Sequence, residues 1–102
     1  MKKFTEILAT LESAEHLQRL ELADADGNIE RIENKPGTQG SLKLYHHLWK
    51  KHGAINSAAA KEGLVLYAEH TEDAQNNPGK HPNIDRLFDV LESGSNYTVT
   101  AI

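Results

Sequence analysis

The chain has 102 residues with a formal net charge of −4; 38% of the residues are hydrophobic and 25% are charged. This length predicts a single domain over residues 1–102, and the absence of cysteine excludes disulfides, a thiolate nucleophile and a thiolate metal site. No apolar run approaches the roughly 18 residues of a membrane-spanning helix, and Glu6 and Glu12 interrupt the apolar stretch that a signal peptide requires, so we expect a soluble cytoplasmic protein with no membrane segment.

The first third of the chain predicts a helix followed by a hairpin. Apolar side chains recur at steps of three and four over residues 5–17, which is typical of an amphipathic helix. Residues 19–23 and 28–33 alternate in polarity around an Asp-Gly turn, and this pattern indicates an antiparallel hairpin. Ile29 and Ile32 are three residues apart and cannot share one face of a regular strand, so we expect a bulge or an early strand end.

Two helices are predicted in the middle of the chain. Ser41 is a suitable N-cap for a helix over residues 41–52 that ends at a glycine. Asn56 or Ser57 then begins a longer helix that reaches about Ala74. Gly63 lies inside this long helix, where it costs roughly 1 kcal/mol relative to alanine, so we expect another backbone to approach closely there.

The C-terminal third predicts one more helix and one strand. Apolar residues from Ile84 to Leu91 have helical spacing, and residues 97–102 alternate and are rich in β-branched side chains. The predicted order is α β β α α α β. We expect an α+β fold in which a small, mostly antiparallel sheet, made of the N-terminal hairpin and the C-terminal strand, is covered by helices.

Charge is segregated along the chain. Residues 34–61 contain five lysines, three histidines and no aspartate or glutamate, so this block is formally positive within an acidic protein. Such a block can dock an anion, a nucleic acid or an acidic partner, or it can face the protein's own carboxylates. Charge alone leaves these alternatives open.

Two loops share the form Pro-Gly-x-x-x-cap. Pro36-Gly37 precedes Ser41, and Pro78-Gly79 precedes Asn83. Each loop leads into a helix N-terminus, where unpaired N–H groups favour an anion. One hypothesis is therefore a phosphate or carboxylate site with four donors, namely Ser41, Lys80, His81 and Asn83. The alternative is that each Pro-Gly pair only makes a turn and each cap only satisfies the helix end.

The same segments support a family resemblance. The runs Pro36-Gly37-Thr38-Gln39-Gly40-Ser41-Leu42, Ala68-Glu69-His70-Thr71 and Pro78-Gly79-Lys80-His81-Pro82-Asn83-Ile84-Asp85-Arg86-Leu87 are similar to those of a family of small bacterial proteins catalogued as a domain of unknown function. The likeness covers nearly the whole chain. It implies a bacterial, cytoplasmic protein, and it carries no activity, ligand or catalytic residue.

Enzymatic and metal-binding signatures are missing from the sequence. The histidines show no metal-ligand spacing, although His52 and His70 both fall on apolar helix sides and could approach each other in the core. No nucleophile elbow is present, and Glu62, Glu69 and Asp73 are expected to form a solvated acidic ridge on the long helix. We therefore predict no metal and no cofactor, and we lean against an enzyme without excluding one.

Residues 48–58 resemble a helix-turn-helix, which is a third alternative. A first helix, a glycine turn and a capped second helix all lie in the basic block. Trp49 stands where such motifs favour a small residue, Glu62 stands where they favour an apolar one, and the overall pI is about 5.8. Nucleic-acid binding is therefore disfavoured.

The leading hypothesis is a non-enzymatic binding or interaction module. Lys43, His47 and Lys50 lie on the side of the predicted helix opposite its apolar residues, and this basic helix face is expected to contact an unknown protein or an anionic ligand. Small-molecule anion binding at the two Pro-Gly loops is the main alternative. A homodimer through the C-terminal strand is also expected to be accessible, because an alternating edge strand can pair with its symmetry mate.

Overall fold

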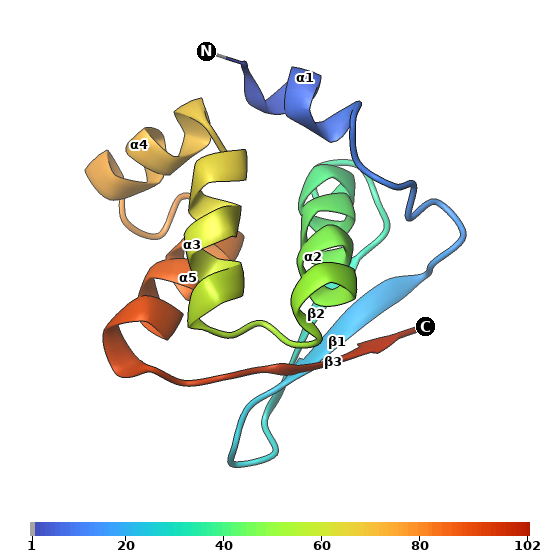
Figure 1. The fold of residues 1–102 in the computed structure, drawn as a ribbon, viewed down its shortest axis with the longest axis vertical. Helices are drawn as coiled ribbons and strands as arrows, with labels where there is room; N and C mark the ends of the chain where they lie inside the picture. Colours follow the sequence, from blue (N-terminus) through green and yellow to red (C-terminus); the bar gives the residue numbers. More distant parts are fainter. Residues whose placement is uncertain (1) are drawn as a thin grey trace.

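The computed structural model describes residues 2–102, which form five helices and a three-stranded sheet (Figure 1). The elements in chain order are α1 (Phe4–Leu8), β1 (Arg19–Ala23), β2 (Ile29–Glu33), α2 (Gln39–His52), α3 (Ser57–Leu66), α4 (Glu69–Asn76), α5 (Pro82–Ser93) and β3 (Thr98–Ala101). The predicted α+β class and the order α β β α α α β are confirmed, with the long helix present as two consecutive helices, α3 and α4. Within residues 2–102, no helix is long and apolar enough to cross a membrane.

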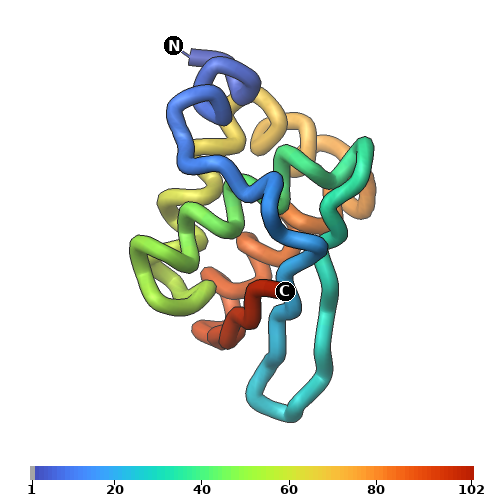
Figure 2. The backbone as a smooth tube through the Cα atoms, turned by 90° about the vertical axis from the view of Figure 1, so that its right-hand side faces the viewer, coloured from blue at the N-terminus to red at the C-terminus, as the bar shows by residue number. Residues whose placement is uncertain are grey.

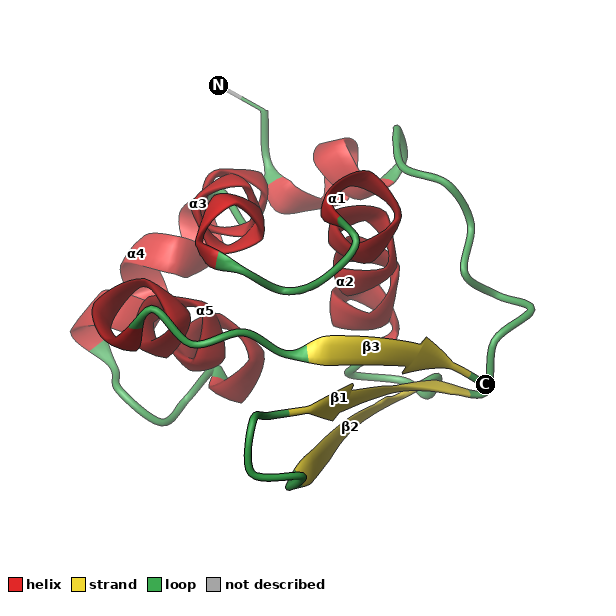
Figure 3. Ribbon diagram, turned by 60° about the horizontal axis from the view of Figure 1, so that its bottom comes forward, coloured by secondary structure: helices red, strands yellow, loops and turns green. Residues whose placement is uncertain are grey.

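The sheet is antiparallel throughout, with the strand order β2-β1-β3. The helices cover one of its faces (Figure 3). Leu20 pairs with Ile32, and Leu22 pairs with Val99, so these side chains point together toward the helices. Leu20, Leu22 and Ile32 are buried in the core. The predicted union of the hairpin with the C-terminal strand is therefore confirmed.

The expectation of a bulge or an early end in β2 is wrong. Ile29 pairs with Ala23 in the same regular register that pairs Ile32 with Leu20. Successive strand residues alternate between faces, so Ile29 points away from the helices and is 48% exposed. Ile32 joins the core, whereas Ile29 stays exposed. An exposed apolar residue is common at protein surfaces, so no bulge is needed to bury Ile29.

The first helix is much shorter than the predicted helix over residues 5–17. α1 ends at Leu8, where the N–H groups of Thr10 and Leu11 donate to carbonyls only three residues back and close the last turn. Thr10 also donates its hydroxyl to the Ile7 carbonyl, 2.7 Å away. The chain then continues to β1 without regular structure along one side of the molecule (Figure 2), and Ala14 anchors it in the core.

α2 and α3 form an antiparallel hairpin of two helices lying side by side (Figure 1). Gly53 ends α2 with a φ of 80°, a conformation that favours glycine. The Asn56 side chain accepts a hydrogen bond from the Ala59 N–H, which confirms the predicted cap of α3. A Cβ at Gly63 would lie 2.7 Å from Leu87 and 2.9 Å from Leu48, so the close approach is made by side chains and not by the backbone that the sequence predicts.

The predicted long helix breaks between α3 and α4. Ala68 adopts a φ of 54°, which no α-helix allows. The Thr71 hydroxyl donates to the Leu64 carbonyl at 2.5 Å and satisfies part of the α3 end. The break directs the buried Tyr67 toward α2, where its hydroxyl donates to Ser41 Oγ at 2.8 Å.

Candidate functional site

The N-terminal end of α2 differs from its prediction. The helix begins at Gln39 after Thr38, so Ser41 lies inside the first turn and does not cap it. Thr38 holds its place by donating its hydroxyl to the Glu33 carbonyl at 2.6 Å. Ser41 Oγ accepts a hydrogen bond from the Tyr67 hydroxyl. Ser41 therefore joins α2 to the end of α3.

One residue of the predicted basic face, His47, is bound by a carboxylate of α3. Glu62 accepts His47 Nε2 at 2.8 Å, His52 Nε2 at 2.7 Å and Lys51 Nζ at 3.1 Å. We call these four residues the Glu62 cluster. Burial raises the pKa of Glu62, but the hydrogen bonds from His47, His52 and Lys51 outweigh burial and lower this pKa to about 2. His47 therefore serves the contact between α2 and α3.

Lys43 and Lys50 remain without an ion-pair partner among residues 2–102. Lys50 is exposed, and its Nζ lies 5.9 Å from the centroid of the Trp49 ring. Lys43 is half-buried at the edge of a cleft. These two lysines are the part of the predicted face that is free to meet an anion.

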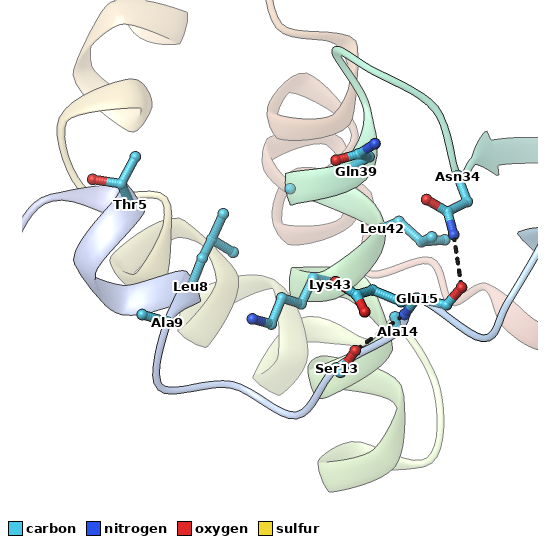
Figure 4. A pocket seen from close by; sticks show the side chains of 11 residues that line it. Thr5, Leu8, Ala9, Ser13, Ala14, Glu15, Asn34, Gln39, Leu42 and Lys43 are labelled. Atoms are coloured by element: carbon cyan, nitrogen blue, oxygen red, sulfur yellow. Dashed lines mark hydrogen bonds between the residues drawn. The ribbon is translucent and has the colours of Figure 1, made fainter.

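The cleft at Lys43 lies between α1, the segment 9–15 and the first turns of α2 (Figure 4). Its volume is about 460 Å³, and its lining residues are Thr5, Leu8, Ala9, Ser13, Ala14, Glu15, Asn34, Gln39, Gly40, Leu42 and Lys43. A Cβ at Gly40 would lie 3.1 Å from Leu8 and 3.3 Å from Phe4, so a glycine here lets α1 approach α2 closely.

The lining of this cleft combines one cation and one carboxylate with neutral polar and apolar side chains. Leu8, Ala14 and Leu42 line it with apolar side chains, Thr5, Ser13 and Gln39 line it with neutral polar ones, and Glu15 adds a carboxylate. Lys43 supplies the positive charge, and its amine extends over the cleft toward α1 (Figure 4). The volume of the cleft lies within the range of ligand pockets, which measure roughly 300–1,000 Å³.

The second Pro-Gly loop is engaged internally. Asp73 of α4 accepts His81 Nε2 at 2.6 Å and Lys80 Nζ at 3.0 Å. The hydrogen bonds from His81 and Lys80 lower the pKa of Asp73 to about 2. The Gly79 N–H donates to Asp85 at 3.0 Å. An acid from α4 and an acid from α5 therefore already occupy the donors that the sequence offers to an anion.

Asn83 is also not the predicted cap. α5 begins at Pro82 after His81, and Asn83 lies in the first turn. Its Oδ1 accepts a hydrogen bond from Arg86 Nη1 at 2.9 Å. The structure thus places Ser41 and Lys43 on α2, but it places Lys80, His81 and Asn83 around α5, so the seven predicted residues do not form one site.

A family model described as uncharacterized protein conserved in bacteria matches residues 4–101. The chain belongs to this family, DUF2322. No curated protein and no solved structure matches the chain. The DUF2322 match extends from the start of α1 to the end of β3, so it contains the Lys43 cleft, the Glu62 cluster and the Asp73 loop. The resemblance inferred from the Pro-Gly segments is thereby confirmed.

Sequence reasoning missed a buried arginine in this DUF2322 chain. Arg86 is only 8% exposed, and its Nε and Nη2 both donate to Glu30 Oε1, at 2.9 and 2.7 Å. Its Nη1 also reaches the hydroxyl of Tyr45 at 3.2 Å. Burial raises the pKa of Tyr45 to about 12, although Arg86 opposes the shift. The spacing of the sequence could have indicated this burial. Arg86 lies four residues before Val90, so both fall on the same side of α5, and Val90 is buried.

Sequence reasoning also missed His46, which is 4% exposed. Burial lowers its pKa, and its Nδ1 has no hydrogen-bond partner in the described part of the chain. The nearest carboxylate, that of Glu12, is 3.7 Å away. His46 therefore packs as a neutral core side chain next to Trp49 and His16.

The remaining histidines fall into separate clusters. His52 belongs to the Glu62 cluster, whereas His70 packs against Phe4 and His81, with ring centroids 5.1 and 5.7 Å away. Over residues 2–102, no three histidine or carboxylate side chains are arranged to hold a metal ion. The expected acidic ridge is wrong, because Glu62 and Asp73 bind different groups of bases.

The α2–α3 pair also differs from a helix-turn-helix. The two helices lie antiparallel and side by side (Figure 1), whereas the DNA-binding motif crosses its helices at roughly 90–120°. Lys51 on this hairpin is paired with Glu62, which reduces the positive charge available for phosphates. The geometry of this region therefore does not favour insertion of α3 into a DNA groove.

Proposed function

We propose that this DUF2322 chain is a non-enzymatic binding protein of the bacterial cytoplasm, and that Lys43 in the cleft between α1 and α2 holds an anionic group of its ligand or partner. One observation carries the proposal: Lys43 is a half-buried cation with no ion-pair partner among the described residues, and it lines a cleft of about 460 Å³. The composition, without cysteine, suits a reducing compartment.

A cation beside an apolar wall is an effective anchor for a carboxylate or phosphate. The attraction is stronger there than in open water, because part of the solvent is excluded. Thr5, Ser13 and Gln39 line the same cleft and supply polar side chains for the rest of the ligand. Lys50 extends the positive surface along α2 toward a shallower depression of about 280 Å³ that Glu12, His47 and Lys51 also line.

The experiment compares Lys43→Gln with Lys61→Gln. Both lysines lie on helices without an ion-pair partner in the described chain, but Lys61 on α3 is exposed and outside the cleft. Inorganic phosphate serves as the probe, and its dissociation constant is measured from amide chemical shifts. We expect Lys43→Gln to weaken phosphate binding at least tenfold and Lys61→Gln to leave it within a factor of two. Equal losses in the two variants, or no phosphate binding by the unmodified protein, would refute the proposal.

A further inference from the structure

The outer edge of β3 has unpaired main-chain groups. Arg19 and Ile102 exchange both of their hydrogen bonds, and such pairs recur every second residue in an antiparallel ladder. Thr98 and Thr100 therefore also direct their N–H and C=O groups toward β1, while Val99 and Ala101 direct theirs away from the sheet. None of these outward groups has a hydrogen-bond partner within residues 2–102.

The free part of this edge has a defined start. Tyr97 also points outward, but it exchanges both main-chain hydrogen bonds with Ile55 from the α2–α3 connection, each at 3.0 Å. The open stretch therefore begins after Tyr97 and contains Val99 and Ala101. It lies at the rim of the sheet, where β3 has β1 on one side only (Figure 3).

The two edges of the sheet differ in their protection. β2, at the opposite edge, carries Glu30, Arg31 and Glu33, and Thr38 covers the Glu33 carbonyl. Charged residues of this kind prevent an edge strand from pairing with another chain. β3 contains no charged residue and no proline, its pairing with β1 is regular, and the following Ile102 is 39% exposed. β3 is thus an unprotected edge strand.

We propose that β3 pairs antiparallel with β3 of a second copy of this chain, around a two-fold axis at Thr100. An antiparallel residue pair exchanges two hydrogen bonds, so pairing Val99 with the partner's Ala101, and Ala101 with the partner's Val99, gives four. Pairing Val99 with its own symmetry mate would place Ala101 opposite the partner's Tyr97, whose groups are already bonded to Ile55. Centring the axis on Ala101 would pair the outward groups of Ala101 with those of its symmetry mate, which gives two hydrogen bonds within the described residues.

The side chains favour a second copy over an unrelated strand. In this register Val99 lies beside the partner's Ala101 on the helix-covered face, and both residues are only partly buried in the single chain. On the other face the exposed Thr100 meets the partner's Thr100, a cross-strand pair that can exchange hydroxyl hydrogen bonds. The result is one continuous six-stranded antiparallel sheet with the order β2-β1-β3-β3-β1-β2, and the two-fold symmetry closes it.

The test measures the mass of the untagged full chain by light scattering as a function of concentration, together with amide hydrogen exchange. We expect a mass of two chains at high concentration, with the Val99 and Ala101 amides protected as the dimer forms. Ala101→Pro removes an outward N–H that the β1 ladder does not use, and it is expected to weaken the dimer at least tenfold. Arg31→Pro makes the same change at the β2 edge and should leave the dimer unaffected.

Three results would overturn the proposal. The first is a one-chain mass up to millimolar concentration with fast exchange at Val99 and Ala101. The second is a dimer that persists in Ala101→Pro. The third is a dimer whose formation leaves these two amides unprotected, which would place the interface elsewhere. The exchange measurement uses the unmodified protein, so it decides the matter even where a proline variant folds poorly.

Discussion

The two Pro-Gly loops have the same sequence form but different electrostatic surroundings. At the first loop, Lys43 of α2 has no ion-pair partner in residues 2–102 and lines an open cleft. At the second, Lys80 and His81 are both bound by Asp73, and Asn83 is bound by Arg86. The difference shows that a local motif can predict a helix start, but it cannot predict whether the charges beside it are available.

The acids that pair with the basic side chains come from neighbouring helices. Asp73 is brought to the second loop because α4 ends just before it, and Glu62 is brought to α2 by the antiparallel α2–α3 hairpin. Lys43 makes no ion pair within residues 2–102, although Glu15 of the segment 9–15 lines the same cleft. Removing these internal acids tests whether they make the bases of the second loop unavailable to an anion.

The largest effect is expected from Arg86→Met. This change removes the buried guanidinium that joins Glu30, Tyr45 and Asn83, and it takes from Glu30 Oε1 and Asn83 Oδ1 the hydrogen bonds that they accept from Arg86. We expect a loss of about 3 kcal/mol in the free energy of unfolding, measured by urea denaturation. Arg31→Met is the control, because Arg31 makes an exposed ion pair worth about 1 kcal/mol or less. A loss equal to that of the control would show that the Arg86 contacts do not hold α5 in place.

Glu62→Gln is expected to cost about 2 kcal/mol at neutral pH, because it removes a charged hydrogen-bond acceptor from His47, Lys51 and His52. The pKa of Glu62 lies at about 2 in the folded chain against an ordinary 4.5. A carboxylate whose pKa is depressed by folding stabilises the protein above its ordinary pKa. The contribution should therefore be complete above about pH 4.5 and lost as the pH falls toward 2.

The measurement for Glu62 is the difference in unfolding free energy between the unmodified chain and Glu62→Gln as a function of pH. The difference should be constant above about pH 5 and shrink in acid. Glu72→Gln is the control, because Glu72 is an exposed α4 residue that makes no ion pair within residues 2–102. A difference that stays constant down to pH 2 would contradict the role assigned to the carboxylate charge.

Asp73→Asn is expected to have the smallest effect on stability, because the ion pairs of Asp73 lie at the surface. Its informative effect is on binding. With Lys80 and His81 released, inorganic phosphate should shift the amides of residues 77–83, whereas we expect no such shifts in the unmodified chain. Asp89→Asn on α5 is the control. If the Asp73 variant shows no new shifts in this loop, pairing with an internal acid is not what makes the bases of the second loop unavailable to phosphate.

Much of the fold could be predicted from the sequence, because the strands and most helices are local features. The Asp-Gly turn, Gly53 and the Asn56 cap each act over a few residues, and each is confirmed. The length of α1 and the break at Ala68 could not be predicted. Both depend on tertiary contacts, namely the path from α1 to β1 and the direction in which Tyr67 must point to reach Ser41.

The candidate site was only partly predictable, for the same reason. The helical spacing of Lys43, His47 and Lys50 defines a face of α2, but the sequence does not show that Glu62 binds His47. Nor does it show a cleft at Lys43, because α1 and the segment 9–15 form its other walls. Arg86 and Glu30 are 56 residues apart, so no local pattern indicates their contact.

The central claim is that the cleft at Lys43, and not the second Pro-Gly loop, receives an anion. Its most direct test is one phosphate titration of the unmodified protein, followed by amide chemical shifts across the chain. We predict that the shifts concentrate at the cleft, in residues such as Thr5, Gly40 and Lys43, while residues 77–83 stay unchanged. Shifts concentrated in residues 77–83, or spread evenly over all lysines, would contradict the claim.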